Sequence, residues 1–240
     1  MTRVRTRVAV RVAQLDWQAI EAALFADGYA LIDGVLAADD CGEIAAMYPR
    51  DELFRSTVHM AAHGFGRGEY RYFRYPLPAP IDVLREESYA RLAPIANRWM
   101  EALRMPERFP ATQQALFDLC VARGQTRPTA LLLTYEPGDW NALHQDLYGE
   151  IAFPFQATCF LSRPGADFTG GEFVLVEQRP RAQSRPEVIV PQLGSMLIFA
   201  NRYRPVQGKN GVYRTVVRHG VSRIRSGRRF ALGIIFHDAN

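Results

Sequence analysis

Apolar residues recur with a helical period through most of the first half of the chain. Asp16 precedes one such stretch as a candidate N-cap, and Gly28 is placed to end that helix. Residues 3–12 instead alternate basic and apolar types, which predicts either a strand with one exposed face or a loose basic arm. The other elements expected in this half are helices at 38–48, 81–103 and 111–122 and strands at 29–32 and 69–75.

From Thr129 onward the pattern changes to short apolar segments separated by Gly and Pro, which is typical of β-structure. The expected strands are 129–135, 144–148, 153–161, 171–177, 188–190, 195–199, 213–218 and 230–236. Together they predict an α+β protein with a double-stranded β-helix (jelly roll) core and N-terminal helices packed on one sheet. We expect a single domain over 1–240, comprising a helical support region at 1–125 and the jelly-roll core at 129–239.

Composition and cysteine usage narrow the class of protein. A chain of 240 residues can bury a sizeable core without disulfides. Cys41, Cys120 and Cys159 are odd in number and far apart, so they are expected to be reduced and packed in the core. No apolar run reaches the roughly 20 residues of a membrane helix, and the N-terminus lacks the apolar core of a signal peptide. These features predict a cytoplasmic enzyme with no membrane contact.

Positive charge is concentrated late in the sequence. The net charge is +4, yet residues 188–237 contain no Asp or Glu. Such a distribution favours an anionic partner, with nucleic acid the first candidate, although a solvated basic face is the alternative. Lys209 is the only lysine, so a general preference for arginine also raises the count. The basic residues in this stretch are Arg202, Arg204, Lys209, Arg214, Arg218, Arg223, Arg225, Arg228 and Arg229.

Two histidines and one aspartate could form a metal site. His144 and Asp146 are two apart in an expected strand, so their side chains should point to the same face. With His219 they make the two-imidazole, one-carboxylate set of non-heme Fe(II) oxygenases, which leaves further positions on the metal open. A lone histidine is more often structural, which is the expectation for His237 at the end of the last strand.

An arginine beyond His219 could bind a carboxylate of a cosubstrate through two parallel hydrogen bonds. Arg223, Arg228 and Arg229 are the candidates. Arg229 shares its strand face with Ala231 and Gly233, whose small side chains leave room for a ligand. Arg228 shares its face with large apolar residues that are expected to pack outside the barrel. Strand alternation therefore favours Arg229.

The region from about Thr129 to Asp238 resembles the Fe(II)/2-oxoglutarate-dependent oxygenase superfamily, in its prolyl-4-hydroxylase-like branch. The segments HQDLYG (144–149), DFTGGEF (167–173) and RHGVSR (218–223) are closest to a bacterial subfamily associated with oxidative demethylation of damaged nucleic acid. The resemblance implies Fe(II), 2-oxoglutarate and O2 as cofactor and cosubstrates. It also implies His144, Asp146 and His219 as catalytic iron ligands, and Arg229 and Tyr135 as contacts of 2-oxoglutarate.

The resemblance implies that 2-oxoglutarate is decarboxylated while a substrate C–H bond is hydroxylated, so that an oxidised N-methyl group would leave as formaldehyde. A base inside a duplex could not reach the iron, so a single strand or a flipped base is required. Trp140 and Tyr148 could stack on such a base or pack in the core. Loop arginines could bind phosphates, and binding would then weaken with salt. These arginines are Arg179, Arg181 and Arg185.

Two other functions fit the same residues. One is hydroxylation of a protein side chain, as in prolyl hydroxylation, or of a small molecule. The other is a binding module on the same scaffold that has lost catalysis, which the complete metal triad disfavours. Formaldehyde release separates demethylation from stable hydroxylation, and succinate formation separates an enzyme from a binder. Nothing in the sequence indicates an oligomeric state.

Overall fold

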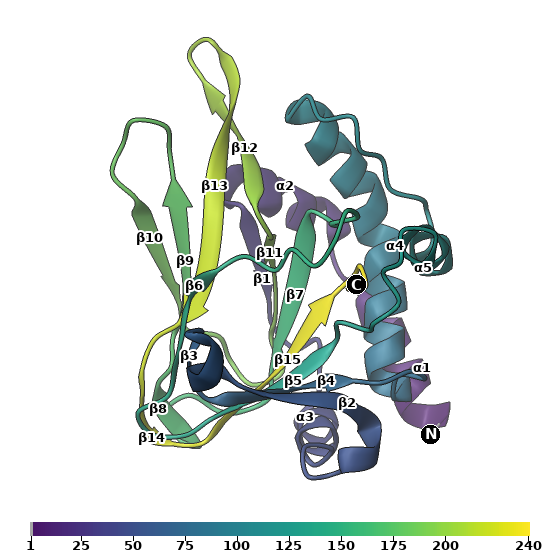
Figure 1. Cartoon of the computed structure of the whole chain (residues 1–240), viewed down its shortest axis with the longest axis vertical. Coiled ribbons are helices and arrows are strands. Elements are labelled where there is room, and N and C mark those ends of the chain that lie inside the picture. Colours follow the sequence, from purple (N-terminus) through teal and green to yellow (C-terminus); the bar gives the residue numbers. More distant parts are fainter. Residues whose placement is uncertain (1) are drawn as a thin grey trace.

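Two antiparallel sheets form the centre of the protein (Figure 1). The computed structural model describes residues 2–240, with side chains from residue 6 onward. The larger sheet has the strand order β1 (Tyr29–Ile32), β11 (Met196–Ala200), β7 (Phe155–Phe160), β15 (Arg229–Ile235), β5 (Leu131–Tyr135), β4 (Glu69–Phe73) and β2 (Phe54–His59). The smaller sheet has the order β10 (Arg185–Ile189), β9 (Phe173–Gln178), β13 (Gly211–Val221), β6 (Trp140–His144) and β3 (Gly66–Arg67), with β12 (Tyr203–Gly208) also paired to β13. A separate ribbon joins β8 (Phe168–Gly170) to β14 (Ile224–Gly227).

Helices cover the outer face of the larger sheet (Figure 1). Aromatic contacts mark this interface: Trp99 of a long helix meets Phe155 of β7 with ring centroids 4.9 Å apart, and Phe25 meets Trp99 at 5.1 Å. None of the helices within residues 2–240 combines the length and apolar character needed to cross a membrane. The helices are α1 (Thr2–Gln14), α2 (Trp17–Asp27), α3 (Ala38–Ala45), α4 (Ala79–Ala102) and α5 (Gln113–Val121), with 3-10 turns η1 (Asp51–Leu53) and η2 (Met60–His63).

The first segment of the chain is a helix, so the prediction of a strand or a loose basic arm at residues 3–12 is wrong. Val8 and Val12 are fully buried, one helical turn apart. Arg7 and Arg11, also one turn apart, bond the buried Asp40 carboxylate at 2.9 and 2.7 Å. The valines recur at both two- and four-residue intervals, so the sequence fits a strand as well as a helix. The ion pairs of Arg7 and Arg11 with Asp40 favour the helix, because residues four apart lie on one helical face.

The capped helix was predicted correctly. The Asp16 side chain accepts a hydrogen bond from the amide of Ala19, and Gly28 takes a left-handed conformation that ends α2.

The N-terminal region also supplies strands: β1 lies at one edge of the larger sheet, and β4 and β2 lie at the other. Strands β2, β3, β8, β12 and β14 were not predicted. The division into a support region at 1–125 and a core at 129–239 within one domain stays a prediction.

The predicted strand at 144–148 is wrong in its position. Strand β6 spans Trp140–His144, and the chain after His144 follows an irregular path. The main-chain amide and carbonyl of Asp146 bond the side chain of Asn201 rather than a neighbouring strand. Because these backbone groups are already satisfied, the ladder ends at His144. Asp146 is therefore placed by side-chain contacts and not by strand alternation.

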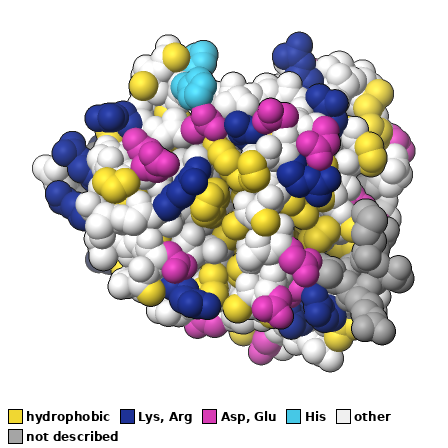
Figure 2. All heavy atoms as spheres, turned by 90° about the horizontal axis from the view of Figure 1, so that it is seen from below, with side chains coloured by type: hydrophobic (Ala, Val, Ile, Leu, Met, Phe, Trp, Pro, Cys, Tyr) yellow, Lys and Arg dark blue, Asp and Glu magenta, His cyan; other side chains and the backbone are white. Residues whose placement is uncertain are grey.

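The basic residues of 188–237 do not share one surface. Arg204 is 4% exposed and bonds Glu177, while Arg229 is 2% exposed and lies in the interior. On the face seen from below, Lys and Arg side chains alternate with Asp and Glu side chains (Figure 2). Arg204 and Arg229 are buried, so these two basic residues of the acid-free stretch are not available on the outer surface to an anionic partner. Cys41, Cys120 and Cys159 are buried and free, as predicted.

Candidate active site

A cavity of about 320 Å³ lies between the two sheets and contains the predicted metal ligands. Its walls are largely apolar and include Leu131, Leu133 and Phe173. Small residues of β15, Ala231 and Gly233, line the side facing the larger sheet. A volume of this size falls within the range of small-molecule sites, so the cavity can hold a ligand of metabolite size.

The two imidazoles are cross-strand neighbours. His144 on β6 pairs in register with His219 on β13, and their ring centroids are 4.1 Å apart. His144 Nδ1 lies 2.7 Å from the carbonyl oxygen of Ala142 and donates to it when protonated there. That bond leaves Nε2 of His144 as the atom that can bind a metal. The sheet register therefore fixes the position of this ligand, and the Ala142 carbonyl favours the tautomer with the proton on Nδ1.

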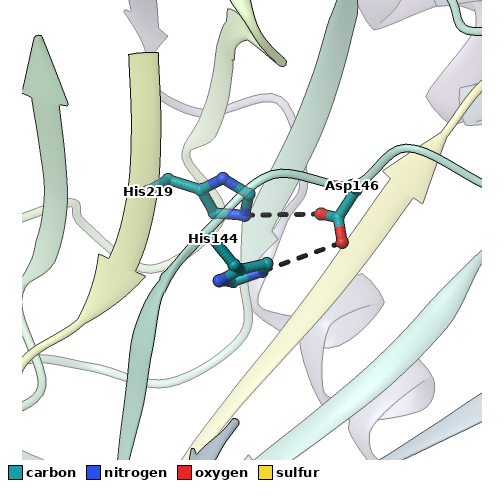
Figure 3. A group of neighbouring side chains, drawn as sticks. All are labelled: His144, Asp146 and His219. Carbon is teal, nitrogen blue, oxygen red and sulfur yellow. Dashed lines mark ion pairs between the residues drawn. The ribbon is translucent and has the colours of Figure 1, made fainter. Parts of the chain in front are cut away.

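The Asp146 carboxylate faces both imidazoles (Figure 3). Its Oδ1 lies 3.7 Å from His144 Nε2 and its Oδ2 lies 3.4 Å from His219 Nε2. The three potential ligand atoms lie within 4.8 Å of one another, and no other such group occurs in the described part of the chain. Two nitrogens and one oxygen converging on one point suit a divalent transition metal held on one side. The three sequence-predicted ligands are thus brought together.

The charges of the triad are tuned by burial and by one another. Burial lowers the pKa of His219 to about 4, so this imidazole is neutral at pH 7, the form that binds metals. Burial alone would raise the pKa of Asp146, but the hydrogen bond from His219, the electrostatic attraction of the two histidines and the hydrogen bond from Tyr148 outweigh it. The net shift of the Asp146 pKa is downward, so the carboxylate is ionised and available as a ligand.

Arg229 points into the cavity and Arg228 points away from it, as strand alternation predicted. The Arg229 guanidinium lies 5.4, 5.5 and 5.9 Å from the ring centroids of Tyr135, Phe160 and Phe168. Its Nη2 is buried and has no hydrogen-bond partner among the described residues. A buried guanidinium nitrogen without an acceptor is costly unless an anion binds there. Arg228 is half-exposed and bonds Thr134 at 3.0 Å on the outer side.

Gly171 makes room for this arginine. Its backbone φ is +66°, and a Cβ there would lie 2.2 Å from Ile224 Cδ1 and 3.2 Å from Arg229 Cδ. A larger residue would adopt the positive φ with strain and would displace the side chain of Ile224 or Arg229. Tyr135 is fully buried beside Arg229, its hydroxyl lies 3.5 Å from Asn141 Nδ2, and burial raises its pKa to about 12. Tyr135 is thus a neutral hydrogen-bonding group in the cavity.

Of the other predicted site residues, one lines the cavity and the rest lie outside it. Tyr148 lines the cavity, whereas Trp140 is 37% exposed and does not. The hairpin of Arg179, Arg181 and Arg185 extends to the upper left in Figure 1, and none of these arginines lines the cavity. Arg179 bonds Glu177 at 2.8 Å and Arg185 lies 3.7 Å from Glu187. His237 accepts a bond from the amide of Phe153, as expected of a structural histidine.

Many cavity residues were not predicted, among them Gln156, Phe65 and Leu143. The Gln156 side-chain amide lies 3.1 Å from His219 Nε2, and its buried Oε1 has no partner among the described residues. Its position in a strand with inward-facing alternate residues was a usable signal. Phe65 and Leu143 line the cavity and are 47% and 48% exposed, so they form its apolar rim. No local pattern marked Phe65, because it reaches the cavity through the pairing of β3 with β6.

Comparison with known proteins places the chain in a family. The family model Oxygenase-NA, described as "Oxygenase, catalysing oxidative methylation of damaged DNA", matches residues 68–239. Two Mycobacterium tuberculosis proteins, Rv2227 and MT2286, are each 50% identical to the chain over 167 residues, which are 70% of this chain and 72% of the relative. Both the long match and the high identity exceed what a shared fold alone would give.

Solved structures agree on the fold. A 2OG-Fe(II) oxygenase-family oxidoreductase from Burkholderia pseudomallei has a TM-score of 0.56 at 18% identity, covering 95% of each chain. A Pseudomonas putida prolyl-4-hydroxylase has a TM-score of 0.55 at 15% identity, covering 93% of this chain and 100% of its own. The predicted jelly-roll fold and the predicted resemblance are both confirmed. The chain belongs to the Oxygenase-NA family of oxygenases that act on damaged DNA.

Proposed function

We propose that the protein is an Fe(II)- and 2-oxoglutarate-dependent dioxygenase that removes methyl groups from N-methylated bases in single-stranded or locally opened DNA. The family description speaks of oxidative methylation. An oxygenase oxidises a methyl group that is already present and does not install one. The reaction is therefore oxidative demethylation, in which the hydroxylated methyl group leaves as formaldehyde.

The proposal rests on one observation: the same cavity contains a set of metal ligands and a buried arginine that has no hydrogen-bond acceptor among the described residues. His144, Asp146 and His219 converge from one side, and the unpartnered Nη2 of Arg229 enters the same cavity. The triad fits Fe(II), and Arg229 fits a carboxylate anion that lies within reach of the metal. A dicarboxylate such as 2-oxoglutarate, which binds the metal at one end and presents a carboxylate at the other, satisfies both.

Each residue then has a defined task. The two imidazoles and Asp146 hold the iron, and the buried Arg229 binds and orients the distal carboxylate of 2-oxoglutarate, with Tyr135 beside it. When bound, iron and 2-oxoglutarate together supply the activation of O2 for oxidation of a C–H bond, with succinate and carbon dioxide as products. The apolar walls, including Leu131 and Phe173, exclude water from the reacting atoms.

The rim of the cavity supports a flat, unstacked base as substrate. Phe65 and Leu143 present exposed apolar surface at the mouth, and the His63 ring stacks on Phe65 at 5.4 Å. Aromatic surfaces of this kind bind bases by stacking, without regard to sequence. Tyr148 lies within the cavity, so its ring is a further contact for the base, while Trp140 would contact a neighbouring nucleotide.

The β9–β10 hairpin supplies the proposed phosphate contacts. Arg179, Arg181 and Arg185 lie outside the cavity, where they would bind the strand backbone rather than the base. Contacts of this type make the affinity for nucleic acid fall steeply with salt concentration.

We also propose that residues 1–240 form a single domain and that the protein is cytoplasmic. The three free, buried cysteines support this location.

Turnover of 2-oxoglutarate tests the proposal. Purified protein with Fe(II) is assayed for succinate in the presence of N-methylated single-stranded DNA, the same unmethylated strand, methylated RNA, and proline-containing peptides. We expect the methylated strand to stimulate succinate formation, and we expect Asp146→Ala to abolish it. Stimulation by a peptide but not by methylated DNA would instead identify a protein hydroxylase. Absence of turnover with every substrate would contradict the proposal.

A further inference from the structure

Asp146 differs from the two histidines in how it is held. His144 and His219 lie in the ladder between β6 and β13, whereas Asp146 follows the end of β6 on an irregular path. Asn201, only 1% exposed, accepts from the Asp146 amide at 3.1 Å and donates to the Asp146 carbonyl at 2.5 Å. These bonds fix the main chain, but they leave rotation of the carboxylate itself unrestrained.

A chain of two tyrosine hydroxyls restrains that rotation. The Tyr148 hydroxyl donates to Asp146 Oδ1 at 2.5 Å, and the Tyr72 hydroxyl donates to the Tyr148 oxygen at 3.1 Å. The Tyr72 and Tyr148 rings meet edge to face at 6.4 Å, and the Arg55 guanidinium lies 4.4 Å above the Tyr72 ring. Tyr72 belongs to β4, so the chain connects the carboxylate to the larger sheet.

We infer that Tyr148 is a positioning residue that makes Asp146 bind the metal through a single oxygen, with Tyr72 holding Tyr148 in place. The inference rests on the proposed metal site. A carboxylate can bind a metal with one oxygen or with two. The Tyr148 hydroxyl occupies Oδ1, which lies 3.7 Å from His144 Nε2, and leaves free Oδ2, the oxygen nearer to an imidazole nitrogen, at 3.4 Å from His219 Nε2. One-oxygen binding keeps a coordination position open for cosubstrate and O2.

Removal of one hydroxyl tests this role without removing a ring. Tyr148→Phe keeps the aromatic packing and deletes only the donor to Asp146. We expect its affinity for Co(II), used as a stable stand-in for Fe(II), to fall about tenfold, as for other groups that orient metal ligands. We also expect its visible Co(II) absorption to change in shape and intensity, because release of Oδ1 allows a second oxygen to bind.

Removal of the Tyr72 hydroxyl tests whether Tyr72 acts through Tyr148. Tyr72→Phe should lower Co(II) affinity by about threefold, and it should have little further effect in the Tyr148→Phe background, because both act through one hydrogen-bond chain. The matched control is Tyr213→Phe, which removes a hydroxyl from β13 outside the cavity. It should leave both affinity and spectrum unchanged.

Three outcomes overturn the inference. One is wild-type affinity and spectrum in Tyr148→Phe. Another is additive losses in the double variant. The third is a fall in the melting temperature of metal-free Tyr148→Phe large enough to explain the weaker binding, which would identify a general role in stability. Failure of the metal site itself is recognised separately: Asp146→Ala would then bind Co(II) as tightly as the wild-type protein does.

Discussion

The two halves of the site are built by different means. Arg229 and Tyr135, the proposed contacts of 2-oxoglutarate, lie opposite each other in the β15–β5 ladder and are 2% and 0% exposed. On the other side, Asp146 lies in irregular backbone and is held by Asn201 and Tyr148. In the first half, sheet register sets the geometry. For Asp146, a few side-chain hydrogen bonds set it, so single substitutions of Asn201 or Tyr148 should alter metal binding with little change to the fold.

The largest expected effect is on the strand-held half. Arg229→Ala should raise the Michaelis constant for 2-oxoglutarate by about 100-fold, which corresponds to roughly 2.7 kcal/mol for a buried charge-assisted contact. Arg228→Ala, one residue away on the outer face, should change it by no more than about twofold, since exposed pairs contribute little. Steady-state succinate formation at varied 2-oxoglutarate measures both. Equal effects of the two substitutions would contradict the assignment of Arg229.

A smaller effect is expected where side chains hold the backbone. Asn201→Ala removes both bonds to the Asp146 main chain and should weaken Co(II) binding by about tenfold. The chain contains a matched control: Asn97 makes the same pair of bonds to Phe109, at 2.7 and 3.0 Å, away from the cavity. Asn97→Ala should lower the melting temperature while leaving Co(II) affinity intact. Loss of metal affinity in both variants would show that general loosening, not local positioning, is responsible.

The smallest effect concerns pH. Burial lowers the pKa of His237 to about 4 from an ordinary value of 6.5, so between these values the unfolded chain binds a proton that the folded chain does not. The free energy of unfolding should therefore fall as pH drops from about 6.5 to about 4. His237→Gln should make this fall shallower, with the remainder due in part to His219. Denaturant unfolding of metal-free protein at several pH values measures the slope, and an unchanged slope would refute the prediction.

The sequence predicted the residues placed by strand register better than the residues placed by side-chain hydrogen bonds. The inward placement of Arg229 followed from the side-chain period of two in a strand, because β15 is a regular strand. Asp146 was identified by its chemistry, but the reason given for its position was wrong, since β6 ends at His144. Tyr72 and Asn201 reach the site from distant segments, and no local pattern reports such contacts, whereas strand alternation in β7 could have marked Gln156. The helix at 2–14 was missed because its period is selected by Asp40, which lies far along the chain.

Measurement of succinate and formaldehyde in a single reaction tests the central claim most directly. The protein, loaded with Fe(II) and 2-oxoglutarate, is incubated with single-stranded DNA that carries one N-methylated base. The two products should form in equal amounts, the base should be restored to its unmethylated form, and Asp146→Ala should yield neither product. Succinate without formaldehyde, or demethylation that persists in Asp146→Ala, would contradict the assignment of demethylation to this cavity.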